Sequence, residues 1–212
     1  LFSSSPLLPQ RERVYACIDD NRRHPFTIEE PTLSVNDADV RLEKIFNKSD
    51  LFSLVDTYRK TYKCLVNPNT PRYIHVDLAL KNDCAGLACS HISGVKETVI
   101  LDDDQRPIRT TAPIVYIDFM VRIRPPDGSE IDLGKIREFI FYLSETGLPI
   151  QKVTYDGFQS AESKQVFIKN GVESEVISVD RKPDPYLALK SAIMEGRVSF
   201  YRYKPFIEEL NS

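Results

Sequence analysis

An acidic residue interrupts an otherwise apolar, strand-like stretch of this 212-residue chain. Residues 72–80 read RYIHVDLAL around Asp77, and Asp83 follows in a loop before a second apolar run, CAGLACSHI. A buried carboxylate is costly unless it is paired, and a bound metal is the commonest such partner at a catalytic site. Asp77 is therefore a candidate metal ligand. The alternative interpretation is a strand-end acid that caps its own turn.

Composition and length are those of an ordinary soluble protein. Hydrophobic residues make up 42% of the chain, which is enough for a sizeable core. There is no charged-then-apolar leader and no apolar run near eighteen residues, so we expect neither a signal peptide nor a membrane span. Because the sequence begins with Leu, we expect a fragment of something longer.

Cysteine spacing and net charge narrow the function only slightly. Cys17, Cys64, Cys84 and Cys89 form no CxxC pair and have no His at zinc-finger spacing, which disfavours a structural zinc site and favours reduced thiols. A net charge of −3 argues against a uniformly basic nucleic-acid coat. A nuclease, however, needs only a local basic track beside an acidic metal site.

The first part of the chain, residues 1–70, reads as an irregular arm or linker with short helices. Serines and prolines break it repeatedly, as in LFSSSPLLPQ and VNPNTPR. Two stretches have helical periodicity, residues 37–46 and 50–62, and the second places Leu51, Leu54, Val55 and Tyr58 on one face.

Regular strands are expected from residue 72 onwards. The pattern predicts strands over 72–80, 84–92 and 114–124, with a charged, proline-containing insertion around LDDDQRPIRTTAP between the last two. Three sequential strands with short connections indicate an antiparallel meander.

Helices and strands then alternate. DLGKIREFIFYLSETG is a helix that ends at Gly147, and strand 150–156 follows. Next we expect a helix over SAESKQVFIKNG capped by Ser160, strand 172–179, and a last helix that begins at Pro185 with Asp184 as its N-cap. The order β-β-β-α-β-α-β-α predicts an α/β fold with a mixed, five-stranded sheet flanked by helices.

That order is the order of the ribonuclease H-like fold, in which acids converge on divalent metals. Asp156 ends strand 150–156, and a parallel crossover after the meander would set it beside the first strand, where ligands of α/β sheets bind. Mg²⁺ and Mn²⁺ prefer hard oxygen ligands, so Asp77 and Asp156 could share a metal in a two-metal site.

Four linked segments resemble the nuclease domain of a tailed-bacteriophage terminase large subunit: PRYIHVDLALKNDCAGLACSH, VYIDFMVRIRPPDGSEIDLGKIREFI, VTYDGFQSAESKQ and SVDRKPDPYLALKSAIMEGRVSFY. The resemblance covers residues 72–210 and is weaker in the preceding arm. It implies a Mg²⁺- or Mn²⁺-dependent endonuclease that cuts concatemeric double-stranded DNA at the start and end of packaging by two-metal hydrolysis. Asp77 matches the first metal acid of the family and Asp156 the second.

The third family acid belongs to a later KDxxDA-type segment that this sequence, ending at Ser212, does not contain. Residues 71–212 are thus expected to be a nuclease domain truncated at its C-terminal end. Three other acids could contribute. Asp184 also has a plain N-cap role, Asp118 could be a solvent-facing or salt-bridged strand acid, and Asp83 could be a turn residue.

The resemblance also implies partners and a location. A GxxxxGK[ST] loop is absent from the sequence, so ATP hydrolysis is not assigned to it. Residues 1–70 would be the tail of the ATPase domain of the same polypeptide or the linker from it. The implied partners are duplex DNA, that ATPase domain, the small terminase subunit and the portal protein, without a membrane, in the cytoplasm of the infected bacterial host.

Phosphate contacts require basic and polar side chains near the acids. The candidates are Lys81 in the loop beside Asp77, Arg122 and Arg124 on one strand, and Gln159 and Ser160 at the turn after Asp156, where capping by Ser160 is the plainer explanation. A second basic cluster comprises Arg181, Lys182, Arg197, Arg202 and Lys204.

Alternation places His75 on the same strand face as Asp77, either as a supporting residue or as a packed strand histidine.

Two other classes of function remain open. Within the same fold, a junction resolvase, a transposase or a 3′–5′ exonuclease would use similar acids on other DNA substrates. A non-catalytic DNA-binding or regulatory module would carry the same acids as structural residues.

Overall fold

The computed structural model describes residues 10–37, 40–78, 83–101, 104–156, 161–177 and 184–211. Its helices are α1 Arg11–Tyr15, α2 Leu42–Ile45, α3 Leu133–Thr146, α4 Ala161–Lys169, α5 Asp184–Met194 and α6 Lys204–Leu210, with a 3₁₀ turn at Lys48–Asp50. Its strands are β1 Phe52–Asp56, β2 Thr61–Cys64, β3 Arg72–Asp77, β4 Ala85–Leu101, β5 Pro107–Ile123, β6 Ile150–Asp156, β7 Glu173–Val176 and β8 Val198–Ser199.

A six-stranded mixed sheet in the order β7-β6-β3-β4-β5-β8 organises the fold. Strands β3, β4 and β5 form the predicted antiparallel meander, β6 pairs parallel with β3, and β7 pairs parallel with β6. The predicted α/β architecture, a mixed sheet flanked by helices in the predicted element order, is confirmed, but the expected strand count of five is wrong. The sixth strand, β8, has two residues paired with β5, too few for a periodic signal.

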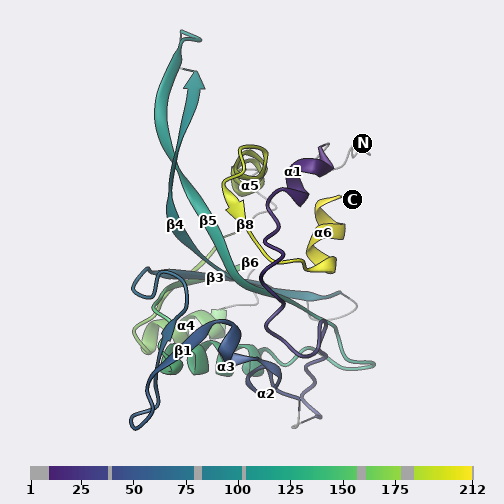
Figure 1. Cartoon of the computed structure of the whole chain (residues 1–212). Coiled ribbons are helices and arrows are strands. Elements are labelled where there is room, and N and C mark those ends of the chain that lie inside the picture. The colour runs from purple at the N-terminus through teal and green to yellow at the C-terminus, as the bar shows by residue number, and fades with distance from the viewer. Residues whose placement is uncertain are drawn as a thin grey trace.

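Helices cover both faces of the sheet (Figure 1). One face packs Ile74, Val76 and Phe119 against Phe139 and Ile140 of α3. On the other face, Met120 lies with Ile193 of α5, Ile207 of α6 and Val14 of α1 in a second core. Because side chains alternate along a strand, Tyr73, His75 and Asp77 are directed to this second face.

Local end signals define helix α3 as predicted. The Asp132 side chain accepts a hydrogen bond from the Gly134 amide at 2.9 Å, and Gly147 ends the helix with φ 111°. A Cβ at Gly147 would lie 2.8 Å from the Tyr62 carbonyl oxygen, so the neighbouring hairpin also requires glycine there.

The prediction of a helix over 50–62 is wrong, because this stretch is a β-hairpin of β1 and β2. The Asp56 carboxylate accepts hydrogen bonds from the amides of Tyr58 and Arg59, both at 2.9 Å, and Lys60 has φ 51°. This Asx-type turn reverses the chain where the apolar spacing had indicated a continuous helix. Of the predicted helix 37–46, the described residues retain α2 alone.

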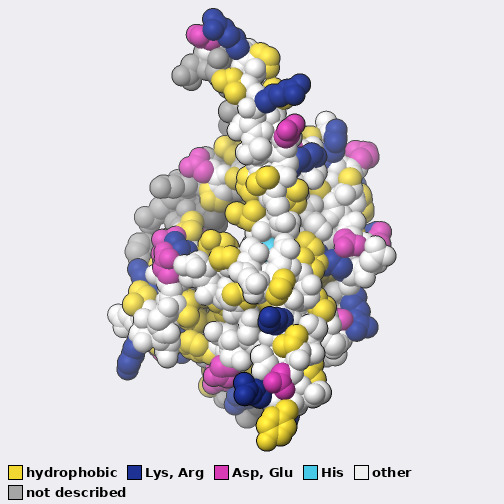
Figure 2. Space-filling view, turned by 60° about the vertical axis from the view of Figure 1, so that its left-hand side comes forward, with side chains coloured by type: hydrophobic (Ala, Val, Ile, Leu, Met, Phe, Trp, Pro, Cys, Tyr) yellow, Lys and Arg dark blue, Asp and Glu magenta, His cyan; other side chains and the backbone are white. Residues whose placement is uncertain are grey.

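The predicted insertion between the second and third strands is instead a continuation of both. Strands β4 and β5 each run for 17 residues and pair from Ala85↔Ile123 to Leu101↔Pro107, forming an arm that projects from the body (Figure 1). Open edges on a two-stranded ribbon tolerate prolines that would break a central strand. Exposed Val95, Val99 and Ile108 contribute to the apolar and basic surface of this arm (Figure 2).

No helix in the described parts of the chain is long and apolar enough to cross a membrane.

Asp118 belongs to a buried ionic cluster. Its side chain is 1% exposed, with Oδ2 2.8 Å from His91 Nδ1 and Oδ1 3.4 Å from Arg72 Nη2. Arg72 also donates to the carbonyl oxygens of Val66, Asn67 and Thr70. The register shift of β5 against β4 occurs at Asp118, a bulge that turns this acid towards Cys89 and Arg72. As a strand acid, Asp118 is thus salt-bridged and not solvent-facing.

Asp118→Ala should lower the free energy of unfolding by about 3–5 kcal/mol, because it leaves Arg72 buried without its carboxylate partner. Urea denaturation measures the change. As a control, Glu138→Ala removes an exposed ion pair with Arg41 and should change stability by less than about 1 kcal/mol. Equal small losses in both variants would contradict a stabilising role for the cluster.

His24 should make stability depend on pH. It stacks on Tyr203 at 4.7 Å between ring centroids, and burial lowers its pKa from 6.5 to about 4. Between these values the unfolded chain binds a proton that the folded chain does not, so the free energy of unfolding should fall as pH drops from 6.5 towards 4. Denaturation at pH 7 and pH 5 should show a smaller loss for His24→Phe than for the wild type. Proton NMR titration of His24 near pH 6.5 would contradict this assignment.

Candidate metal and nucleic-acid site

Sheet register brings the two predicted metal acids together. In the parallel pair β3–β6, Asp77 lies directly opposite Asp156. The antiparallel pairs continue this row, because Gly86 lies opposite Asp77 and Arg122 opposite Gly86. Paired residues on neighbouring strands point to the same face. Asp156, Asp77, Gly86 and Arg122 therefore form one row across four strands, on the face opposite to the Ile74 and Val76 core.

The burial expected of Asp77 is wrong. Strand β3 ends at Asp77, and its side chain is exposed there, while Asp156 at the end of β6 is half-buried. Exposure removes desolvation as the reason to suspect a metal. The reason that remains is proximity. Like charges directly opposite each other on adjacent strands, whose backbones lie about 4.8 Å apart, repel each other, and a bound cation would offset that repulsion.

His75 stands beside the two acids, as alternation predicted. Its Nδ1 lies 2.8 Å from Thr154 Oγ1, and that hydroxyl lies 3.3 Å from the Ile74 carbonyl oxygen, to which it donates. His75 and Thr154 thus share a hydrogen bond whose donor depends on the tautomer of the imidazole. Burial lowers the pKa of His75, and the charges of Asp77 and Asp156 oppose this effect. A neutral imidazole is thus fixed next to the carboxylate pair.

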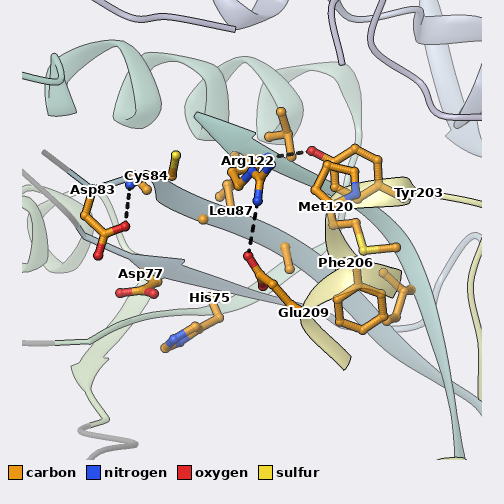
Figure 3. Close-up of a pocket in the computed structure, with 16 residues that line it drawn as sticks. His75, Asp77, Asp83, Cys84, Leu87, Met120, Arg122, Tyr203, Phe206 and Glu209 are labelled. Atoms are coloured by element: carbon orange, nitrogen blue, oxygen red, sulfur yellow. Dashed lines mark hydrogen bonds and ion pairs between the residues drawn. The ribbon is translucent and has the colours of Figure 1, made fainter. Parts of the chain in front are cut away.

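A pocket of about 460 Å³ opens over Asp77, Gly86 and Arg122, three of the four residues of this row. At one end lie Asp77 and Asp83, and at the other Arg122 with Tyr203 and Glu209 of the C-terminal segment (Figure 3). Gly86 forms the floor between the two ends, and a Cβ there would lie 3.7 Å from the Asp77 Cβ. The missing side chain leaves space between the carboxylates and the guanidinium.

Asp83 fits both roles considered for it. Its Oδ1 accepts a hydrogen bond from the Cys84 amide at 2.8 Å, as a turn residue would, and it also lines the pocket (Figure 3). By contrast, Asp118 lies with Arg72, whose odd spacing from Asp77 on β3 directs it to the opposite face of the sheet. Asp184 is exposed as the first residue of α5, outside the pocket lining.

Arg122 and Arg124 are engaged by an acid that sequence reasoning missed. The Glu30 carboxylate binds Arg122 Nε and Nη2 through one oxygen and Arg124 Nη2 through the other. Burial acts to raise the pKa of Glu30, but the hydrogen bonds and charges of Arg124 and Arg122 outweigh it and lower that pKa. Arg122 Nη1 also lies 3.5 Å from Glu209 Oε1 (Figure 3). No local pattern marks Glu30, which is 92 residues before Arg122 in the chain.

The other predicted contacts divide into two groups. Lys81, Gln159 and Ser160, together with Arg181 and Lys182, lie outside the described residues. The rest of the second basic cluster forms ion pairs, Arg197 with Glu195, Arg202 with Asp20 and Lys204 with Glu208. Arg197 is 7% exposed and donates to the Pro113 carbonyl oxygen, so it anchors the base of the arm.

The donor set around Asp77 fits a hard divalent cation. Among the described residues, no group of three or more His, Cys, Asp and Glu side chains is gathered closely enough to hold a metal by itself. Magnesium, however, typically uses one or two carboxylates and completes its shell with water and substrate phosphate oxygens. Asp77 in the open pocket and Asp156 directly opposite it on β6 supply that number of carboxylates.

Two solved structures are similar to this chain. The large terminase nuclease from thermophilic phage G20c is 16% identical over 69% of this chain and 66% of its own, with a TM-score of 0.45. The HK97 bacteriophage large terminase is 11% identical over 96% of this chain and 35% of its own, with a TM-score of 0.47. This chain thus spans less than two thirds of either. No protein-family model matches it, and no curated protein matches it. With both TM-scores below 0.5, function has to be inferred from the residues.

Proposed function

We propose that this chain is the metal-dependent endonuclease domain of a viral DNA-packaging terminase large subunit. In this proposal it cleaves concatemeric double-stranded DNA at the initiation and termination of packaging by two-metal phosphodiester hydrolysis. The observation that supports the nuclease activity is the register that sets Asp156 directly opposite Asp77, which lines one end of an open pocket. The four segments that resemble terminase nucleases supply the packaging role.

Asp77 and Asp156 would hold Mg²⁺ or Mn²⁺, with Asp83 available from its loop. The bound metals would supply an activated water and stabilise the leaving 3′ oxygen. Arg122, at the other end of the pocket, would position a backbone phosphate without reading sequence. His75 would limit the positions open to the two carboxylates, because its ring lies beside them and is hydrogen-bonded to Thr154. Lys81, Arg124, Gln159 and Ser160 are proposed as further DNA contacts.

The proposal carries partners with it. Duplex DNA is the substrate, and the ATPase domain of the same polypeptide, the small terminase subunit and the portal protein are the proposed partners, in the host cytoplasm. Residues 1–70 would connect to the ATPase domain. Another ribonuclease H-like nuclease would share the acid pair, whereas a non-catalytic DNA-binding module would not need its carboxylates.

We expect Mn²⁺-dependent nicking of supercoiled plasmid to fall by more than about 100-fold in Asp77→Asn and in Asp156→Asn. A loss of that size exceeds what is usual when a residue that only supports a metal ligand is changed. Each variant removes one negative charge from the row and leaves its shape. Asp104→Asn, an exposed carboxylate outside the pocket lining, is the matched control and should cut like the wild type. Undiminished nicking by both row variants would rule out the carboxylate pair as the catalytic site.

Gly86 provides a second test of the pocket. Gly86→Leu should place a side chain between Asp77 and Arg122 and reduce nicking at least about tenfold, with the melting temperature little changed. Gly86→Ala adds a Cβ at ordinary contact distance and should remain near wild-type activity. Full activity of Gly86→Leu would mean that DNA does not approach across the Asp77–Arg122 row.

A further inference from the structure

The N-terminal segment contacts the arginine end of the pocket from the side of β5. Residues 29–33, termed here the acidic strap, run beside the end of β5. The Arg124 amide donates to the Pro31 carbonyl oxygen at 2.8 Å, and Thr32 forms a parallel bridge with Arg124. The Tyr203 hydroxyl donates to the Glu29 carbonyl oxygen at 3.0 Å, and Leu33 is fully buried. The strap is therefore held at both ends, with Glu30 between them.

Glu30 engages both arginines at once. Its side chain is 14% exposed, whereas those of Arg122 and Arg124 are 31% and 58% exposed. Guanidinium groups donate to carboxylate oxygens and to phosphate oxygens alike. The carboxylate thus occupies the positions that two phosphate oxygens would take between these guanidinium groups. A second acid, Glu209 of α6, places its Oε1 3.5 Å from Arg122 Nη1.

Arg122 is well placed for a phosphate on the same DNA strand as the one at the acids. It stands in the row with Asp77, two strands away, a separation of about 10 Å at the usual strand spacing. Gly86 leaves the intervening floor without a side chain. A backbone that follows the row would meet the carboxylate pair first and the arginines next.

We propose that Arg122 and Arg124 form a phosphate-binding site for a nucleic-acid backbone and that Glu30 is its built-in competitor. In this state the acidic strap keeps the site closed. A DNA phosphate, or a movement of the N-terminal segment, opens it by displacing the Glu30 carboxylate. The site extends the proposed nuclease function and rests on it for the identity of its ligand.

Binding of a fluorescein-labelled DNA duplex in EDTA, measured by anisotropy at several salt concentrations, tests this proposal without requiring cleavage. Glu30→Gln should bind about 5–10-fold more tightly than the wild type, with a log–log salt dependence steeper by about one or two phosphate contacts. Glu138→Gln, which removes the same charge from an exposed pair with Arg41, should shift the affinity by less than about twofold. The Glu30→Gln gain should disappear when Arg122 and Arg124 are also changed to Gln.

Unchanged or weaker binding by a Glu30→Gln variant that melts like the wild type would overturn the proposal, because Glu30 would then hold the arginines ready rather than occupied. If Glu30→Gln melts at a lower temperature than the wild type, Glu30→Asp replaces it, because this variant keeps the charge but has a shorter side chain. It should still bind DNA more tightly than the wild type. Equal affinity would overturn the proposal as well. Plasmid nicking separates the two ideas. Tighter binding without any nicking contradicts the nuclease function alone, and nicking without tighter binding contradicts the competitor alone.

Discussion

The register of the parallel pair β3–β6 is the constraint on which the site depends. Ile74 and Val76 on β3, with Val153 and Tyr155 on β6, are buried on one face, so Asp77 and Asp156 are forced onto the other as direct partners. A slip of either strand by one residue would turn its apolar side chains out of that core and its acid into it. Packing against α3 and α4 thus offsets the repulsion of two carboxylates placed side by side.

The two faces of the sheet separate charges of different kinds. On the α3 side, Asp118, Arg72 and His91 are buried and satisfy one another, which makes them part of the core. On the other side, Asp77 and Arg122 face an open pocket. Asp77 and Asp118 both follow apolar strand residues in the sequence, yet one lies at a pocket and the other in the core. Strand alternation and one bulge in β5 decide which face of the sheet each acid reaches.

Distant parts of the chain converge on β5. Tyr201 and Tyr203 hydrogen-bond through their hydroxyls to the backbone of Met120 and Arg122, and the acidic strap lies against Arg124. The arginine end of the pocket is thus framed by an N-terminal and a C-terminal segment. Because Glu30 binds both guanidinium groups, a motion of the N-terminal segment would change the contacts of Arg122 and Arg124.

The sequence by itself determined the elements whose signals are local. Asp132 and Gly147 mark the ends of α3, and strand patterns locate β3 and β6. The acid within the first of these predicted strands and the acid at the end of the second identify Asp77 and Asp156 as candidates. The Asx turn at Asp56, which makes a hairpin of the predicted helix, was a local signal that apolar spacing concealed. Tertiary structure alone decided the exposure of Asp77, the burial of Asp118 and the contact of Glu30 with Arg122. These depend on strand register and on pairing across 92 residues, and such contacts leave no trace in the spacing of neighbouring residues.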